Sequence, residues 1–196
     1  LLSAGGVTFA AFPRVYAVMF SSLYSALMLI LFALILRGVA FEFRGKVDSP
    51  GWRKLWDACI FIGSFLPALL FGVAFANIFQ GIPIDQKGVY QGTLFTLLNP
   101  YGLIGGVLFV LLFLVHGALW LAAKTQGELQ ERAASIAGKI WLAEVAVAVV
   151  FLAASYVTTN LYANYLAKPL LFAVILLTVA ALFGIRLFLA QKAFFK

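Results

Sequence analysis

The chain has 196 residues, of which 64% are hydrophobic and 11% are charged, whereas a soluble domain carries roughly 25% charged residues. This composition leaves too little polar surface to cover a water-soluble globule, and it predicts an all-α fold, a polytopic bundle of transmembrane helices. The net charge of +7 does not indicate a nucleic-acid partner, because Lys and Arg lie in short segments between apolar runs.

We expect a single membrane domain over residues 1–196, with five full spans and one partial span at its N-terminal end. The predicted spans cover about residues 1–19, 21–37, 57–79, 98–123, 140–157 and 170–189. Pro13 interrupts the first apolar stretch, so either it kinks one over-long helix or a turn near Ser21 and Ser22 separates two spans. We favour the turn, because a bilayer about 30 Å thick would force a continuous helix over residues 1–36 into severe tilt.

The polar segments between the spans differ in character. Residues 37–57 form the most charged loop, in which Pro50 and Gly51 break the helix and Trp52 and Trp56 are placed to anchor at the interface. The next polar segment, residues 80–97, is nearly neutral. Residues 124–139 are polar again, and we expect them to extend one helix beyond the bilayer.

The number of Lys and Arg residues alternates between high and low in successive polar segments. There are five in residues 37–57, one at Lys87, three in residues 124–139, one at Lys168 and three near the C-terminal end. The positive-inside rule then predicts that the loops 37–57 and 124–139 and the C-terminus are cytoplasmic.

The span at 98–123 is opened by Asn99-Pro100 and closed by Lys124, and it contains Gly102, Gly105 and Gly106. Such small residues favour close helix approach, with a cofactor cleft as the alternative. Further polar residues stand at span ends, where helix capping and interface contacts explain them. These residues are Arg37, Asp57, Asn77 and Asn99.

His116 is the only histidine, and it lies about two turns before Lys124. It is a candidate haem ligand, proton-relay group or hydrogen-bond donor to a quinone carbonyl. Alternatively, it packs in the bundle interior against a neighbouring helix. A b-type haem normally takes two axial side chains, which one histidine cannot supply.

Glu144 and Arg14 are the other polar candidates for cofactor binding. Glu144 lies about one turn inside its span, where a carboxylate is costly unless it is paired or protonated. It could contact His116, pair with Lys139 or snorkel to the interface. Arg14 needs a specific partner, an anionic lipid or water.

The sequence contains no P-loop, CxxC, HExxH or GxSxG motif and no pair of histidines. The lone Cys59 excludes an intrachain disulfide and is interpreted as a packing residue. We therefore assign no catalytic residue and no metal ligand to this chain.

Several segments of the sequence form distinctive motifs. They are RGVAFEFR at 37–44, WRKLWD at 52–57, FIGSFLP at 61–67, GVAFANIFQGIP at 72–83 and LLNPYGLIGG at 97–106. In this order and spacing the chain resembles subunit II of the cytochrome bd quinol oxidases over about residues 1–145. The resemblance also implies that the chain is truncated at both ends, with an acidic, Trp-rich segment before Leu1.

The resemblance implies a respiratory heterodimer in the cytoplasmic (inner) membrane of a bacterium or archaeon. Its larger subunit I holds haem b and haem d, oxidises quinol and reduces oxygen to water. Subunit II packs against it without binding haem, and in some members it holds a structural quinone or lines a path for oxygen or protons. A small accessory subunit and membrane lipids are further expected partners.

Two other functions remain open from the residues alone. A transporter or channel component would need broken helices and polar groups meeting at the bilayer midplane, yet the mid-span positions here are almost wholly apolar. A non-redox membrane scaffold is the second alternative. Co-purification of haem would distinguish the oxidase subunit from both.

Overall fold

The computed structural model describes residues 2–86 and 89–190. It forms two compact units, Leu1–Gly106 and Val107–Lys196. Lys87, Lys192 and Lys196, which belong to the predicted charge pattern, lie outside the described residues.

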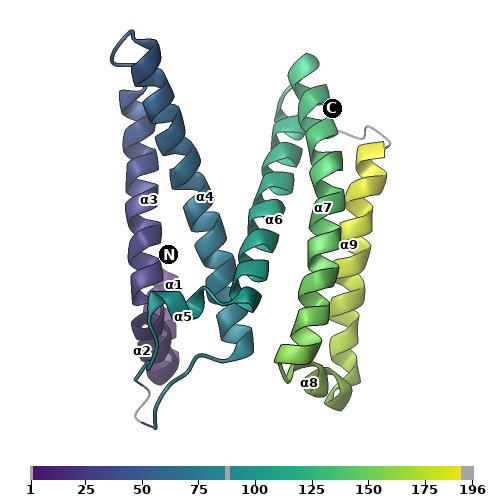
Figure 1. Ribbon diagram of the computed structural model, residues 1–196. Coiled ribbons are helices and arrows are strands. Elements are labelled where there is room, and N and C mark those ends of the chain that lie inside the picture. Colours follow the sequence, from purple (N-terminus) through teal and green to yellow (C-terminus); the bar gives the residue numbers. More distant parts are fainter. Residues whose placement is uncertain (1, 87–88, 191–196) are drawn as a thin grey trace. The chain divides into compact units, whose positions relative to one another are not determined.

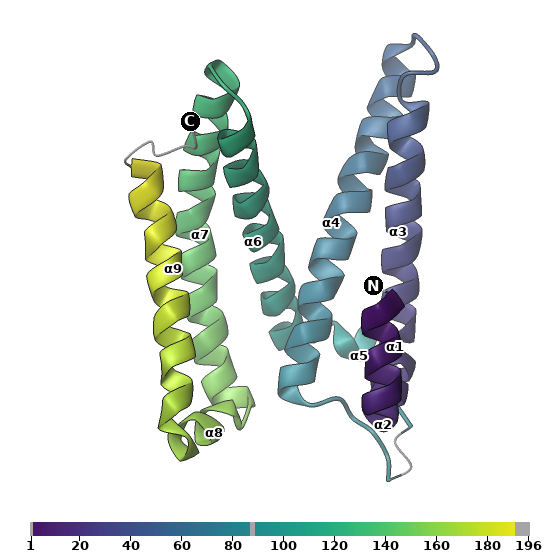
Figure 2. The same ribbon diagram turned by 180° about the vertical axis from the view of Figure 1, so that it is seen from behind.

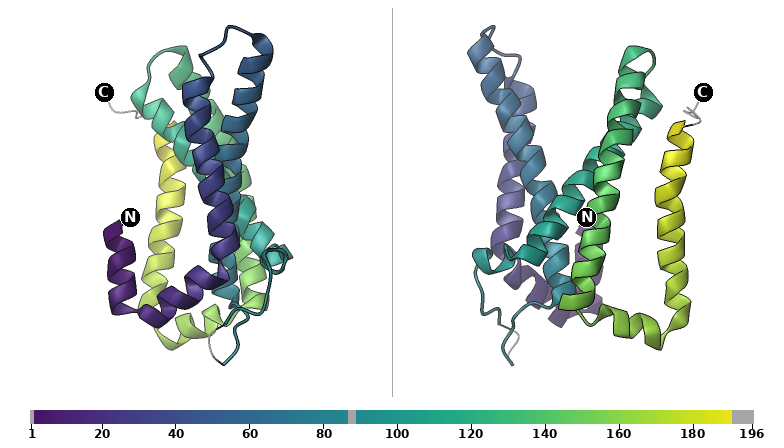
Figure 3. Two further views of the ribbon diagram at one scale, coloured as in Figure 1. Left: turned by 90° about the vertical axis from the view of Figure 1, so that its left-hand side faces the viewer. Right: turned by 45° about the vertical axis from the view of Figure 1, so that its right-hand side comes forward.

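The first unit begins with two short helices, α1 (Leu2–Ala11) and α2 (Pro13–Ser22). Phe12 between them is non-helical (φ −136°, ψ 59°), because the ring of a following proline disfavours the helical conformation. Figure 3 shows the resulting bend. We expected one span over 1–19, whereas the structure gives two helices of 10 residues. Each is about 15 Å long, too short to cross about 30 Å of hydrocarbon.

The helices α3 (Tyr24–Phe43) and α4 (Pro50–Gln80) form an antiparallel pair. They lie side by side in Figure 1 and, from behind, in Figure 2. Their backbones approach closely at Gly63, where an added Cβ would lie 2.6 Å from the carbonyl oxygen of Ala33. Small residues at a contact allow this approach between membrane helices.

The turn between α3 and α4 covers only residues 44–49. Arg44 and Asp57 form an ion pair across it, and the indole N–H of Trp52 donates to the last carbonyl of α3 at 2.8 Å. Both helices thus extend into the predicted loop 37–57. The predicted loop was too long because hydropathy marks the apolar body of a helix and not its hydrogen-bonded ends.

A connection over residues 81–93 follows α4. It leads to the short α5 (Leu94–Leu97), and α6 (Pro100–Lys124) begins three residues later. Gly81 ends α4 with a positive φ of 96°, a conformation that glycine adopts without strain. Within the connection, burial raises the pKa of Tyr90, and a hydrogen bond with Thr96 opposes that shift.

Asn77 fastens the end of α4 to the start of α6. Its side chain is 4% exposed, and its amide nitrogen donates to the carbonyls of Val73 (2.8 Å) and Leu97 (2.7 Å). Its amide oxygen accepts a hydrogen bond of 2.9 Å from Asn99. Asn99 in turn accepts from the backbone N–H of Gly102 at 2.7 Å and so caps α6. The capping role predicted for Asn99 is confirmed, whereas Asn77 is a buried bridge between elements.

Glycines bring the same two helices together. A Cβ on Gly72 of α4 would overlap the Gly105 carbonyl oxygen and lie 2.7 Å from the Cα of Gly106. The close approach predicted for the glycines at 105 and 106 is confirmed. Gly117 takes no part in such a contact, since nothing lies within 4 Å of its Cβ position.

The second unit contains the rest of α6, α7 (Glu128–Thr158), α8 (Leu161–Ala167), the 3₁₀ turn η1 (Pro169–Leu171) and α9 (Phe172–Ala190). Figure 3 shows how α8 connects α7 to α9 at one end. Trp141 holds α7 against α9. Its indole N–H donates to the carbonyl of Leu182 at 2.9 Å, and its ring meets Phe183 edge to face. The guanidinium of Arg186 lies 5.9 Å from the Trp141 ring centroid.

Four helices are long and apolar enough to cross a membrane, namely α3, α4, α6 and α7. A fifth is counted if α8 and part of α9, which meet at 114°, are taken as one broken span. Apart from an isolated bridge between Ile84 and Tyr90, the described residues form no β-structure. The predicted all-α, multi-pass membrane protein is therefore confirmed.

We predict that Gly72→Ala lowers the free energy of unfolding by about 1–3 kcal/mol, because the new methyl group must push two helix backbones apart. The measurement is thermal unfolding of the purified protein in detergent. Gly38→Ala is the matched control, since nothing lies within 4 Å of its Cβ position in α3, and it should be neutral or stabilising by up to about 1 kcal/mol. Equal effects of the two substitutions would contradict the prediction.

We also predict that Asn77→Leu destabilises the protein by about 1–3 kcal/mol, because the Leu97 carbonyl and the Asn99 amide each lose a buried partner. The same unfolding assay measures the loss. Ser64→Ala serves as the control, since the exposed Ser64 hydroxyl donates only to the carbonyl of Ile60 in its own helix. That variant should stay within about 0.5 kcal/mol of the parent.

Candidate functional site

The three polar residues that the sequence singles out lie on three different helices: Arg14 on α2, His116 on α6 and Glu144 on α7. Arg14 belongs to the first unit and the other two to the second, and within the described residues of the second unit no hydrogen bond or ion pair joins His116 to Glu144. The chain therefore offers separate polar positions.

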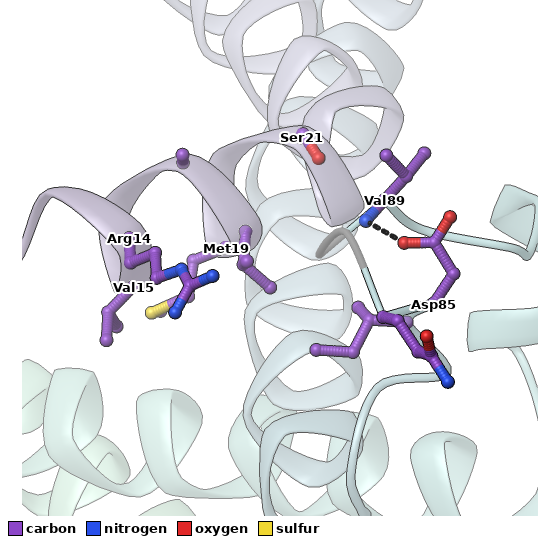
Figure 4. A pocket seen from close by; sticks show the side chains of 10 residues that line it. Arg14, Val15, Met19, Ser21, Asp85 and Val89 are labelled. Carbon is purple, nitrogen blue, oxygen red and sulfur yellow. Dashed lines mark hydrogen bonds between the residues drawn. The ribbon is translucent and has the colours of Figure 1, made fainter.

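Arg14 lines an open pocket of about 620 Å³ within the first unit. Figure 4 shows Arg14, Val15 and Met19 on the α2 side and Asp85 and Val89 on the connection that follows α4. The Asp85 carboxylate accepts a hydrogen bond of 2.8 Å from the backbone N–H of Val89. The pocket thus combines one guanidinium and one carboxylate with mainly apolar walls.

His116 lies on the exposed side of α6, next to Val115, which is only 2% exposed. This placement differs from the interior packing that we considered from the sequence. The imidazole is therefore presented outward by this chain, towards whatever surrounds α6.

Glu144 lies on the buried side of α7 and is 6% exposed. One of its carboxylate oxygens, Oε2, is buried without a hydrogen-bond partner. It neither pairs with Lys139 nor reaches an exposed position, so the structure supports neither the ion pair nor the snorkelling that we considered.

The described residues hold few side chains that commonly bind metals or haem. Within residues 2–86 and 89–190, no three His, Cys, Asp or Glu side chains gather where they could hold a metal ion. The only histidine, His116, lies on α6, and the only cysteine, Cys59, lies on α4. A b-type haem normally takes two axial side chains, and two histidines are not available here because the sequence has one.

Sequence reasoning missed the pocket, because its two walls, one from residues 14–21 and the other from residues 84–86 and Val89, meet only through the fold and share no motif. The burial of Glu144 did leave a signal. The buried residues of α7 follow helical spacing, and they are Ala133, Ala137, Trp141, Glu144 and Ser155.

The family model described as "Cytochrome bd terminal oxidase subunit II" matches residues 1–195. The chain is also similar to "Probable cytochrome oxidase subunit 2" of Haemophilus influenzae, with 49% identity over 140 residues, covering 69% of this chain and 37% of the relative.

Two further relatives carry related names. "Cytochrome bd-I ubiquinol oxidase subunit 2" of Escherichia coli K12 is 47% identical over 136 residues, covering 67% of this chain and 36% of that protein. "Cytochrome bd ubiquinol oxidase subunit 2" of Bacillus subtilis 168 is 41% identical over 162 residues, covering 83% and 48%. The chain spans between about a third and a half of the length of these relatives. With the helical fold and the family match along nearly its whole length, the chain belongs to the cytochrome bd terminal oxidase subunit II family.

Proposed function

We propose that this chain is the haem-free subunit of a cytochrome bd-type quinol oxidase. In this proposal it packs against a larger subunit I that holds haem b and haem d, oxidises quinol and reduces oxygen to water. The observation that carries the proposal is the family match over residues 1–195, together with relatives that are named as ubiquinol oxidase subunits.

The donor set of the chain supports the haem-free role. A single histidine on an exposed helix face provides one axial ligand at most, and the described residues hold no cluster of metal-binding side chains. The haems carry the electrons and reduce the oxygen in such a complex, and we assign their axial ligands to subunit I.

The surface of the membrane helices supports packing against a partner. Large apolar side chains are exposed on every long helix of the described chain, including Phe32 (62%) on α3, Phe61 (67%) on α4 and Trp120 (60%) on α6. These faces fit lipid tails or another apolar subunit. Against subunit I they would keep water from the haems and leave an apolar route along which oxygen can partition.

A structural quinone would find its most suitable place in the pocket at Arg14. The guanidinium can donate hydrogen bonds to a carbonyl oxygen of the quinone head group. The walls include Val15, Met19 and Ile84, which suit the apolar ring. The other two polar candidates are less suitable, because His116 lies on an exposed helix face and Glu144 is only 6% exposed.

The charge pattern supports an orientation in the cytoplasmic membrane, with loops 37–57 and 124–139 and the C-terminus in the cytoplasm. The remaining proposed partners are quinol, membrane lipids and a small accessory subunit.

We predict that the chain, purified from native membranes with its neighbours, carries visible absorption bands of both haem b and haem d. Organic extraction of the same sample should release quinone. A preparation without haem that conducts a solute in vesicles would instead identify a transporter or channel component. A preparation with neither haem nor flux would identify a scaffold.

We further predict that His116→Ala leaves the haem b and haem d bands of the assembled complex unchanged, because the sequence contains no second histidine. The measurement is the reduced-minus-oxidised visible spectrum per mole of complex. Leu114→Ala, which shortens another exposed side chain of α6, controls for effects on assembly. Loss of one haem's bands in the His116 variant alone would refute the prediction.

A further inference from the structure

Glu144 occupies the middle of the buried face of α7. It is the seventeenth residue of a helix of 31 residues, and it lies about one turn inside the apolar part of that helix, which begins at Ile140. It follows Ala133, Ala137 and Trp141 at spacings of four, four and three residues, and all of them are buried. The carboxyl group therefore lies on the side of α7 that packs within the second unit.

The carboxyl group has no counter-charge in the described part of the chain. The ion pairs there are Arg44–Asp57, Lys46–Glu42 and Arg53–Asp48, which all lie at the turn between α3 and α4. Within the second unit, His116 of α6 and Lys139 of α7 are exposed. Arg186 of α9 is engaged with the ring of Trp141, one turn before Glu144.

An ionised carboxylate in this position would be very unfavourable. Moving an isolated charge from water into an apolar medium is strongly unfavourable, and a carboxyl group in such a place takes up a proton and becomes neutral instead. Ionisable groups inside membrane spans are rare for the same reason, and those that occur mark functional positions.

We propose that Glu144 is a proton-binding site, a neutral carboxylic acid held within the membrane-spanning part of the chain, which a small membrane-soluble carbodiimide reaches through the 6% of the residue's surface that the chain leaves exposed. The inference goes beyond the assignment to an oxidase, because it concerns this carboxyl group whatever complex contains the chain. Neither the family match nor the names of the relatives assign a role to this residue.

The carbodiimide reaction distinguishes a protonated acid from a carboxylate. The acid gives its proton to one nitrogen of the reagent, and its oxygen bonds to the central carbon as one C=N bond becomes single. The adduct then rearranges to a stable N-acylurea, and no group leaves. An ionised carboxylate in an apolar site has no proton to give.

The decisive experiment is infrared difference spectroscopy of the complete complex in membranes, comparing the parent with Glu144→Gln. We expect the variant to lose a carbonyl band of a protonated carboxylic acid, and this band should shift when H₂O is replaced by D₂O. Glu128→Gln is the matched control at the exposed start of α7, and it should lose carboxylate bands. Loss of carboxylate bands in the Glu144 variant would overturn the proposal.

Carbodiimide labelling of the parent complex tests the site without any substitution. Peptide mass spectrometry should find the adduct on Glu144 at about tenfold or more the level on the exposed Glu128 and Glu131. Label confined to the exposed glutamates, or no label at all, would overturn the proposal. This arm remains decisive if Glu144→Gln fails to assemble, and neither arm depends on oxidase activity.

Discussion

The structure depends on one constraint, which is that polar groups inside the hydrocarbon layer must find their hydrogen-bond partners within the protein. Helices satisfy the backbone, and several hydroxyl side chains are satisfied by their own helix. Ser64, Ser155 and Thr178 each donate to the carbonyl four residues earlier, at 2.7 to 2.8 Å. Asn77 has too many polar atoms for this solution, so it bridges three segments instead. The connection between α4 and α6 is thereby fixed by hydrogen bonds where apolar contact alone would specify little.

The same surroundings explain why small residues, and not large ones, mark the tightest contacts. Lipid tails are as apolar as Leu or Phe, so burying a large side chain between helices gains little over leaving it in lipid. The contacts at Gly63 and Gly72 let backbones approach closely and gain dispersion contacts. Large residues can then remain outside, as Phe32 and Phe61 do.

The sequence was sufficient for the fold class, because 64% hydrophobic residues in long runs allow few other folds. It also identified the glycines at 105 and 106 and the cap at Asn99, since these follow local rules. It marked the interruption at Pro13 but treated a kink there and a turn near Ser22 as alternatives, whereas the structure breaks the helix at both Phe12 and Leu23. The Arg14 pocket could not be predicted from the sequence, because its opposite wall comes from residues about 70 positions later, which the path of α3 and α4 brings there.

The polar residues tell more about this protein's surroundings than its apolar surface does. An exposed Phe suits lipid and a protein partner equally, so the family match, and not the exposed apolar faces, supports subunit I as the partner. His116 and Glu144 differ in a way that hydropathy does not reveal: the imidazole is exposed, whereas the carboxyl-bearing residue is only 6% exposed. An exposed polar group can form a hydrogen bond with a neighbouring molecule, but a buried one must be paired or neutralised within the chain. For Glu144, with no cation paired to it in the described residues, the economical resolution is a bound proton.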